Sequence, residues 1–134
     1  MIVLDSSFLV AFHNTRDAHH KSAARLMGRF LDGEWGSGLL LEYVFLEVVT
    51  VLAARASVAT AVDVGDTLLR AEELEFVPCS ELFLDAYAMF RAQGDRGLSL
   101  ADSAIVALAD ARNAPHVATF DADFHRIDRI IVVP

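Results

Sequence analysis

Residues 98–124 read LSLADSAIVALADARNAPHVATFDADF, a helical pattern followed by a strand-like segment. Apolar residues recur at helical spacing between positions 99 and 113, which predicts a helix. Asn113 and Pro115 end that helix, because asparagine tolerates a left-handed cap and proline often follows one. The next segment, HVATF (116–120), is typical of a strand. A helix followed at once by a strand indicates an α/β protein.

The same alternation extends over the rest of the chain. Further strands are expected at IVL (2–4), EFVPC (75–79) and IIVV (130–133), and further helices over 17–32, 39–55, 58–73 and 80–93. The Gly-rich segment WGSGL (35–39) is the one slot for a second strand, and its signal is weak. Strands that alternate with helices of this length predict a parallel sheet flanked by helices.

Length and composition fit one globular domain spanning 1–134. The chain has 134 residues, of which 54% are hydrophobic and 22% charged, which excludes a disordered class. It contains no apolar run of about 18 residues, so no membrane span is expected. The start, MIVLDSSFLV, lacks the basic region of a signal peptide, and Cys79 is the single cysteine. These features favour the cytoplasm.

The net charge of −8 argues against a nucleic-acid-binding protein with a generally basic surface. The positions of the acids are therefore more informative than their sum. Asp5 directly follows the first strand, Asp121 directly follows VATF, and Asp102 lies in the first turn of its helix. In a parallel α/β sheet, strands end and helices begin at the same rim, where ligands bind. Three distant segments thus bring carboxylates toward one rim.

Each of these acids also has a purely structural interpretation. Asp5 could cap a helix, and Asp121 could be a turn residue in the segment DAD. Asp123, in the same segment, is more often a turn or cap residue than one that assists a metal. Ser99 and Asp102 have the spacing of a capping box, although that box normally uses the longer Glu or Gln. Asp102 also shares a helix face with apolar residues, namely Ile105, Val106 and Ala109. A charge on such a face needs compensation, which a cation would supply.

Two glutamates in the helix expected over 39–55 are further candidates for the same rim. Glu42 and Glu47 are five residues apart, or about 140° around a helix, so they do not point to the same spot. Helical geometry alone does not choose between them. Glu42 lies nearer the helix start, where an exposed acid is favoured electrostatically.

The motifs of several other chemistries are missing. The chain has no Gly-x-Ser-x-Gly elbow, no P-loop, no dinucleotide-binding Gly-x-Gly-x-x-Gly and no His-Glu-x-x-His. A dehalogenase-type phosphotransferase would need an acid where Ser7 stands, and a receiver domain would need a late lysine, whereas Lys21 is the only one. Hard oxygen ligands for Mg²⁺ or Mn²⁺ remain. One or two such ions can activate water for in-line attack on a phosphodiester.

Four segments together resemble the PIN-domain family, and within it the VapC-type toxin ribonucleases of type II toxin–antitoxin systems. They are MIVLDSSFLVAF, YVFLEVVTVLAAR, GLSLADSAIVALA and ATFDADF, in the family's order. The resemblance implies a three-layer Rossmann-like PIN domain with a parallel sheet of about five strands. It also selects Glu47 over Glu42.

The resemblance further implies Mg²⁺- or Mn²⁺-dependent cleavage of RNA. The implied catalytic set is Asp5, Glu47, Asp102 and Asp121, with metal ligands Asp5, Asp102 and Asp121 and with auxiliary roles for Ser6, Ser7, Thr119 and Asp123. It implies a homodimer and a small antitoxin protein as partner. The lack of a long apolar run separately predicts no membrane association. Because the acids repel one another without metal, bound metal is expected to stabilise the fold.

Two other functions stay open from the sequence. The same fold could be a non-catalytic binding module, or a metal-dependent DNA nuclease or phosphatase. To bind an RNA backbone, the protein would need basic side chains near the site, although the chain as a whole is acidic. The candidates are Arg16, Arg25, Arg29, Arg96 and Arg126, although a solvated surface position is the more frequent role of such residues.

Overall fold

The computed structural model describes residues 1–134 except for the side chain of Arg96. One sheet contains five strands in the order β3-β2-β1-β4-β5, and every neighbouring pair is parallel. The strands are β1 (Ile2–Leu4), β2 (Gly38–Leu41), β3 (Leu74–Val77), β4 (His116–Ala118) and β5 (Ile131–Val133). This confirms the predicted α/β architecture with a parallel sheet of about five strands.

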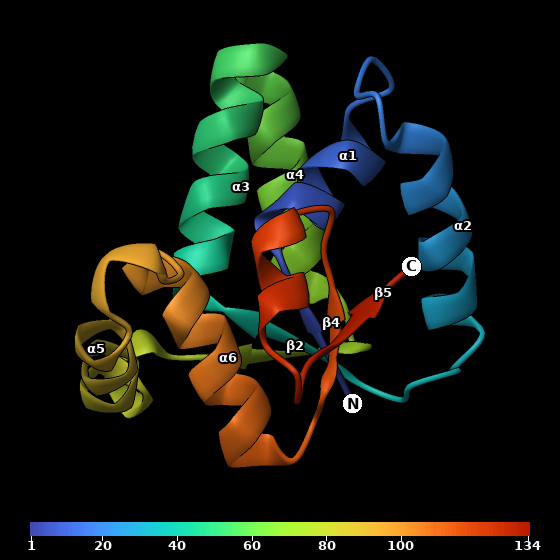
Figure 1. The fold of residues 1–134 in the computed structure, drawn as a ribbon. Helices are drawn as coiled ribbons and strands as arrows, with labels where there is room; N and C mark the ends of the chain where they lie inside the picture. The colour runs from blue at the N-terminus through green and yellow to red at the C-terminus, as the bar shows by residue number, and fades with distance from the viewer.

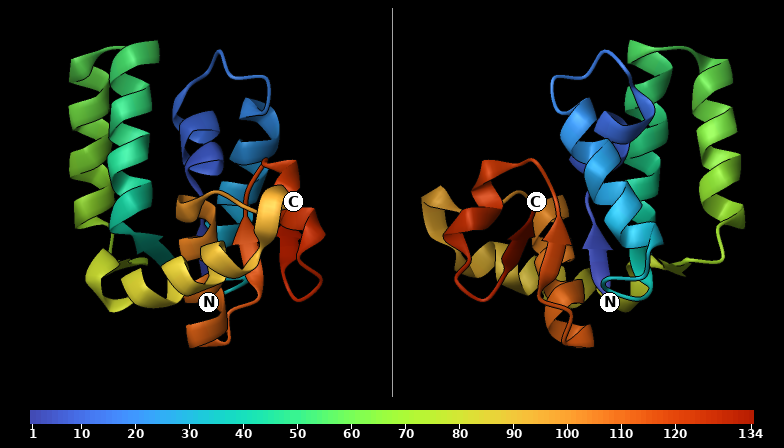
Figure 2. Two further views of the ribbon diagram at one scale, coloured as in Figure 1. Left: turned by 60° about the vertical axis from the view of Figure 1, so that its left-hand side comes forward. Right: turned by 90° about the vertical axis from the view of Figure 1, so that its right-hand side faces the viewer.

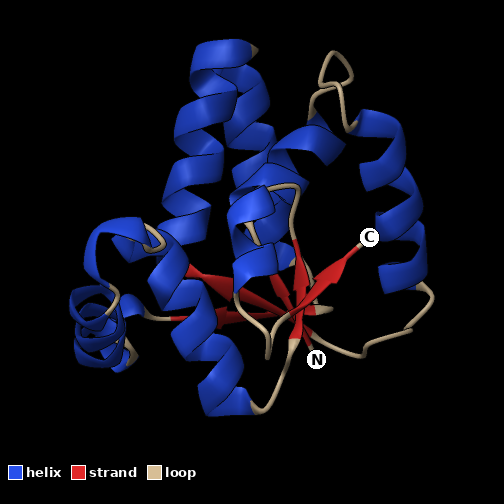
Figure 3. Cartoon of the chain, viewed as in Figure 1, coloured by secondary structure: helices blue, strands red, loops and turns tan.

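Helices lie on both faces of the sheet and make a three-layer arrangement (Figures 1 and 3). They are α1 (Ser6–His13), α2 (His20–Leu31), α3 (Glu42–Arg55), α4 (Val58–Arg70), α5 (Phe83–Ala92) and α6 (Leu100–Arg112), with short 3₁₀ turns η1 (Cys79–Glu81), η2 (Gly94–Arg96) and η3 (Ala122–Arg126). Helix α1 packs on α2 and α3, α3 packs on α4, and α5 packs on α6 (Figure 2). None of these helices is long and apolar enough to span a bilayer.

Strand β1 lies at the centre of the sheet, between β2 and β4. Ile2 is opposite Gly38 on one side and His116 on the other. The chain builds β2 and β3 on one side of β1 and then returns to build β4 and β5 on the other. The carboxyl ends of β1 and β4 therefore flank the point where the strand order reverses, which is where α/β sheets bind ligands. Asp5 follows β1 and Thr119 follows β4 at that point.

The start of the helix expected over 39–55 was wrong, because Leu39–Leu41 belong to strand β2 and α3 begins at Glu42. The strand expected at 35–39 is likewise shifted to Gly38–Leu41. All three leucines are fully buried. A parallel strand that is covered on both faces is apolar at every position, and periodicity cannot distinguish it from a buried helix.

Helix α1 was not among the predicted helices. It has eight residues, and four consecutive ones, Phe8 to Ala11, are buried. A short helix without a polar face gives little periodic signal. The other predicted elements agree with the structure apart from their ends. The predicted left-handed cap at Asn113 is confirmed, with φ of 50°.

Gly38→Ala is expected to destabilise the protein by about 1–3 kcal/mol, because the added methyl would overpack the core. A Cβ there would lie 2.8 Å from Leu74 Cδ2 and 2.9 Å from Phe30 Cζ. Gly28→Ala, inside α2 and with open space around it, is the matched control. It should stabilise the helix by up to about 1 kcal/mol. Urea unfolding followed by circular dichroism measures both, and a Gly38→Ala variant as stable as the wild type would contradict this account of the packing.

Candidate active site

Asp5 occupies the junction between β1 and α1 and is only 4% exposed. Its backbone N–H donates to the carbonyl of Ala118 at 3.0 Å, which ties the end of β1 to β4. Asp5 stands at the N-cap position of α1, but its side chain makes no capping hydrogen bond. Helix capping therefore does not explain this buried carboxylate.

Two hydroxyl groups, here named the hydroxyl clamp (Ser7 and Thr119), hold one oxygen of Asp5. Ser7 Oγ and Thr119 Oγ1 each lie 2.7 Å from Asp5 Oδ2 and donate to it. Ser7 Oγ accepts from the N–H of Phe120, and Thr119 Oγ1 accepts from the N–H of Asp121, both at 2.9 Å. The backbone after β4 thus orients both hydroxyls. Each of them has a single proton, and both protons are directed to Asp5.

The other oxygen of Asp5 is left available. Within the described part of the chain, Oδ1 has one polar contact, to Ser6 Oγ at 3.5 Å, which is at the limit of a hydrogen bond. A buried carboxylate with one oxygen clamped and the other nearly unpartnered is well prepared to bind a ligand. The structure therefore brings the three predicted auxiliary hydroxyls, from Ser6, Ser7 and Thr119, around Asp5.

Asp121 combines a turn role with a position at the site. Its Oδ1 accepts the N–H of Asp123 at 2.9 Å and caps η3, so the turn interpretation holds for that oxygen. The same residue lines a pocket with Ser6 and Glu47. Asp123 is placed differently, because its carboxylate lies 3.4 Å from the guanidinium of Arg126.

Asp102 lies at the start of α6, where Ser99 is the cap. Ser99 Oγ accepts the N–H of Asp102 at 3.1 Å. Ile105, Val106 and Ala109, which share its helix face, are at most 2% exposed. Asp102 itself is half-buried. Ser99 thus caps the helix, while the Asp102 carboxylate stands at the end of a buried apolar face, as the helical spacing predicted.

The Asp102 carboxyl titrates well above its ordinary range. Burial, followed by the negative charges of Asp5 and Asp121, raises its pKa from 3.8 to about 6, and Glu47 adds a smaller increase. A hydrogen bond with Ser99 offsets part of this. Charges raise a neighbour's pKa in this way only when they lie close to it and lack compensation. Carboxylates from four separate segments therefore interact electrostatically at one site.

The structure separates the two glutamates of α3. Glu47 is exposed and lines the pocket beside Asp121. Glu42 instead accepts the N–H of Cys79 through Oε2 at 2.8 Å, which joins the start of α3 to η1. Glu42 is thus a structural residue rather than an exposed helix-end acid, and Glu47 is the glutamate that faces the site.

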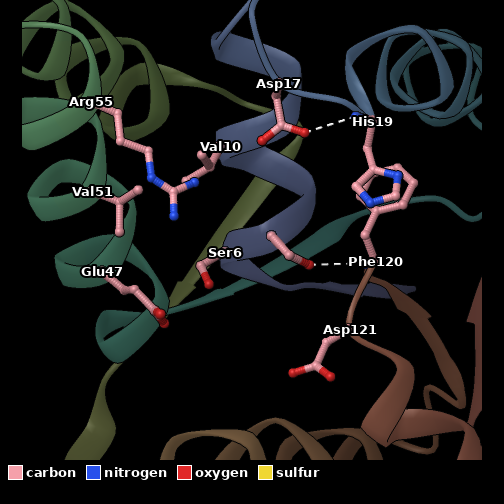
Figure 4. A pocket seen from close by; sticks show the side chains of 10 residues that line it. Ser6, Val10, Asp17, His19, Glu47, Val51, Arg55, Phe120 and Asp121 are labelled. Atoms are coloured by element: carbon pink, nitrogen blue, oxygen red, sulfur yellow. Dashed lines mark hydrogen bonds between the residues drawn. The ribbon is translucent and has the colours of Figure 1, made fainter.

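The pocket has a volume of about 260 Å³ and is formed by α1, the loop before α2, the face of α3 and the segment after β4 (Figure 4). Its walls carry the carboxylates of Asp17, Glu47 and Asp121 and the guanidinium of Arg55. Arg55 was not among the arginines predicted to contact RNA. Its spacing from Glu47 through Val51, at i+4 and i+8, is the signal that could have found it.

Two of the arginines predicted to contact RNA, Arg29 and Arg126, interact with acidic residues outside this pocket. Arg29 Nε donates to Glu34 at 2.7 Å, and its guanidinium covers the ring of Trp35. Arg126 pairs with Asp123. The side chain of Arg96 lies outside the described part of the structure. Arg29 and Arg126 therefore have protein partners, unlike the arginine that lines the pocket.

The donor chemistry of the site fits a hard divalent cation. No three His, Cys, Asp or Glu side chains among the described residues lie close enough together to enclose a metal as they stand. Mg²⁺ does not need such a cage, because it keeps several waters and binds through one or two carboxylates. A cation would also relieve the repulsion that raises the pKa of Asp102.

Comparison with known protein families identifies the fold. The family model of the PIN domain matches residues 2–130. The chain belongs to the PIN domain family. No curated protein sequence matches the chain.

Solved structures of other proteins have the same fold. VapC20 of Mycobacterium tuberculosis, described as a toxin that cleaves the sarcin-ricin loop, superposes with a TM-score of 0.88 at 22% identity over 100% of both chains. VapBC2 of Rickettsia felis, bound to a promoter DNA fragment, has a TM-score of 0.68 at 19% identity, covering 98% of this chain and 97% of that one. A toxin–antitoxin complex of Klebsiella pneumoniae gives 0.68 at 15% identity, with coverage of 98% and 96%.

Proposed function

We propose that this PIN domain is a metal-dependent ribonuclease, the toxin of a toxin–antitoxin pair, which hydrolyses RNA phosphodiester bonds. The proposal rests on the convergence of Asp5, Glu47, Asp102 and Asp121: burial, together with the negative charges of the other three acids, raises the pKa of Asp102 to about 6. The PIN family match and the likeness to toxin structures support the same conclusion.

The proposed roles follow from the positions of the acids. Asp5, Asp102 and Asp121 would hold Mg²⁺ or Mn²⁺, in part through waters that the ion keeps, and Glu47 would complete the acidic set from the exposed side. When bound, the ion supplies activation of a water nucleophile and stabilises charge that develops on the phosphate. The hydroxyl clamp donates two hydrogen bonds to Asp5 Oδ2 and so orients the carboxylate, which leaves Oδ1 to bind the ion. No protein nucleophile is required.

Cleavage assays with three substrates separate the alternatives. A labelled single-stranded RNA, an RNA stem-loop with an unpaired loop and a DNA of matching sequence are incubated with the protein and Mn²⁺. We expect cleavage of RNA and not of DNA. Preferential DNA cleavage would favour the DNA nuclease, release of phosphate from a phosphomonoester alone would favour the phosphatase, and binding of RNA without cleavage would favour the binding module.

The proposal includes a homodimer and an antitoxin partner. Helix α5 leaves large apolar side chains exposed, among them Leu84 at 77% and Phe83 at 50%, which supports a protein–protein interface. A second, mainly apolar pocket between α1, α2 and α4 supports binding of a partner segment.

Expression in cells tests the toxin assignment. We expect the protein to be toxic, and we expect the toxicity to be relieved by the product of a neighbouring small reading frame or by the substitution Asp5→Ala.

Thr119→Val is expected to lower kcat by about 10–100-fold, because it removes one hydroxyl that orients Asp5 and the acceptor of the Asp121 N–H. Thr119→Ser keeps the hydroxyl and should retain most activity. Thr50→Val is the matched control, since among the described residues the Thr50 hydroxyl bonds only to the carbonyl of Leu46 in its own helix. Initial rates of RNA cleavage decide the matter, and equal rates for the Val and Ser variants of Thr119 would refute a positioning role.

A further inference from the structure

One wall of the pocket is not used by the acidic site. Arg55, in the last turn of α3, extends into the pocket above Glu47 and Val51 (Figure 4). Its side chain is exposed. The ion pairs formed by described residues use other arginines, namely Arg29, Arg70, Arg112, Arg126 and Arg129. The acidic side chains that line the pocket with Arg55 are those of Asp17, Glu47 and Asp121. Because Arg55 forms no ion pair with them or with any other described residue, its guanidinium is available to an anion.

A stacked pair of rings forms the opposite wall. His19 and Phe120 lie parallel, with 4.5 Å between ring centroids and 7° between ring planes. His19 is exposed. Its backbone N–H donates to Asp17 Oδ1 at 2.8 Å, which orders the loop before α2. The N–H of Phe120 donates to Ser7 of the hydroxyl clamp. The rings are therefore tied to the backbone that also positions Asp5 and Asp121.

We propose that Arg55 and the His19–Phe120 pair form a subsite for one nucleotide of the RNA chain beside the cleaved bond. Arg55 binds a backbone phosphate, and the exposed face of the stacked rings receives an unpaired base. The inference rests on the proposed ribonuclease function and deepens it, because it specifies a single-stranded segment as the substrate. Bases that are not paired are recognised by stacking on aromatic side chains, whereas those in a duplex are not accessible for this.

Charge balance supports the assignment of Arg55. The chain carries a net charge of −8, and the acids of the site repel a polyanion. A bound metal ion would offset this only at the cleaved phosphate, so a neighbouring phosphate needs its own cation. Arg55 is the one arginine or lysine among the described residues that line the pocket.

The first test compares Arg55→Ala with Arg70→Ala. Both residues are the basic side chain in the last turn of a helix, so both variants lose the same favourable interaction with a helix end. Binding of a short single-stranded RNA is measured with chelator present, at several salt concentrations. We expect Arg55→Ala to weaken binding about tenfold and to reduce the salt slope by about 0.7. Arg70→Ala should match the wild type, and Arg55→Lys should keep the slope.

The second test concerns stacking. His19→Ala should weaken binding of the same RNA about tenfold, while His19→Phe, which keeps a flat ring, should restore it. An abasic ribose-phosphate chain of equal length is the control ligand. It should bind the wild type and His19→Ala equally, yet remain sensitive to Arg55→Ala.

The outcomes distinguish the subsite from the catalytic proposal. If the wild type cleaves RNA but Arg55→Ala and His19→Ala bind RNA as Arg70→Ala does, the subsite is refuted and the ribonuclease stands. If the wild type binds RNA with the expected sensitivity to Arg55 and His19 but cleaves none, the subsite is supported and the catalytic proposal fails.

Discussion

Asp5→Asn is expected to lower the rate of RNA cleavage by about a thousandfold and to leave the fold unchanged. The variant is isosteric, and its carbonyl oxygen can still accept from both hydroxyls of the clamp. The amide nitrogen then replaces the available oxygen of Asp5. An amide nitrogen donates hydrogen bonds and does not bind a hard cation, so the site loses a ligand without losing its frame.

The control for this variant is Asp63→Asn on the exposed face of α4, which makes the same change of net charge. Single-turnover cleavage rates, with circular dichroism spectra of each protein, make the comparison. Loss of activity in Asp63→Asn as well would point to a general charge effect. An Asp5→Asn variant with more than a tenth of wild-type activity would contradict the assigned role.

Asp102→Asn is expected to have two effects of opposite kind. Cleavage should fall by about a hundredfold or more, because a metal ligand is lost. The metal-free protein should become more stable at neutral pH, because the substitution removes a half-buried charge that Asp5, Asp121 and Glu47 repel. The expected increase in the free energy of unfolding is about 1–2 kcal/mol, because solvent screens part of the repulsion at a partly exposed carboxylate.

The pH dependence of that gain follows from the direction of the shift. Asp102 has a pKa of about 6 in the folded protein against an ordinary value of 3.8. Below the ordinary value the carboxyl is protonated in both folded and unfolded states, so the charge costs nothing and the variant gains nothing. The cost appears as pH rises through this interval and is complete above the folded pKa. Wild-type stability relative to Asp102→Asn therefore falls between these two values.

Asp110→Asn provides a control on the same helix. Asp110 pairs with Arg129 at 2.8 Å on the surface, so its loss should lower stability slightly and not raise it. Melting temperatures across the pH range, with and without Mn²⁺, give the measurement. Mn²⁺ should raise the melting temperature of the wild type more than that of Asp102→Asn, since only the wild type keeps the full ligand set. A variant with no gain at neutral pH without metal would refute the electrostatic account.

The convergence of the acids could be predicted because it depends on features that are local in sequence. Asp5 and Asp121 follow short strands, and parallel strands end at one rim of the sheet. Asp102 stood on an apolar helix face, where a charge is costly without a partner. Each inference needed only the few residues around one acid and a general rule of sheet geometry.

The features that were missed depend on contacts between distant segments. The second strand was expected at 35–39, and Leu39–Leu41 were assigned to the following helix because they are apolar at every position. These leucines are covered on both faces of the sheet, and Gly38 is needed there by Phe30 and Leu74. The hydrogen bond from the backbone N–H of Cys79 to the Glu42 carboxylate joins residues 37 positions apart. The stacking of His19 on Phe120 spans most of the chain. No local pattern encodes such pairs.

We propose that these carboxylates form a metal-dependent centre for RNA cleavage. Cleavage of one labelled single-stranded RNA by wild type and by Asp5→Asn, each with Mn²⁺ and with excess chelator, tests this. We expect rapid cleavage only by the wild type with Mn²⁺, and rates lower by about a thousandfold or more in the other three reactions. Equal cleavage by the wild type with Mn²⁺ and with chelator, or by Asp5→Asn with Mn²⁺, would contradict it.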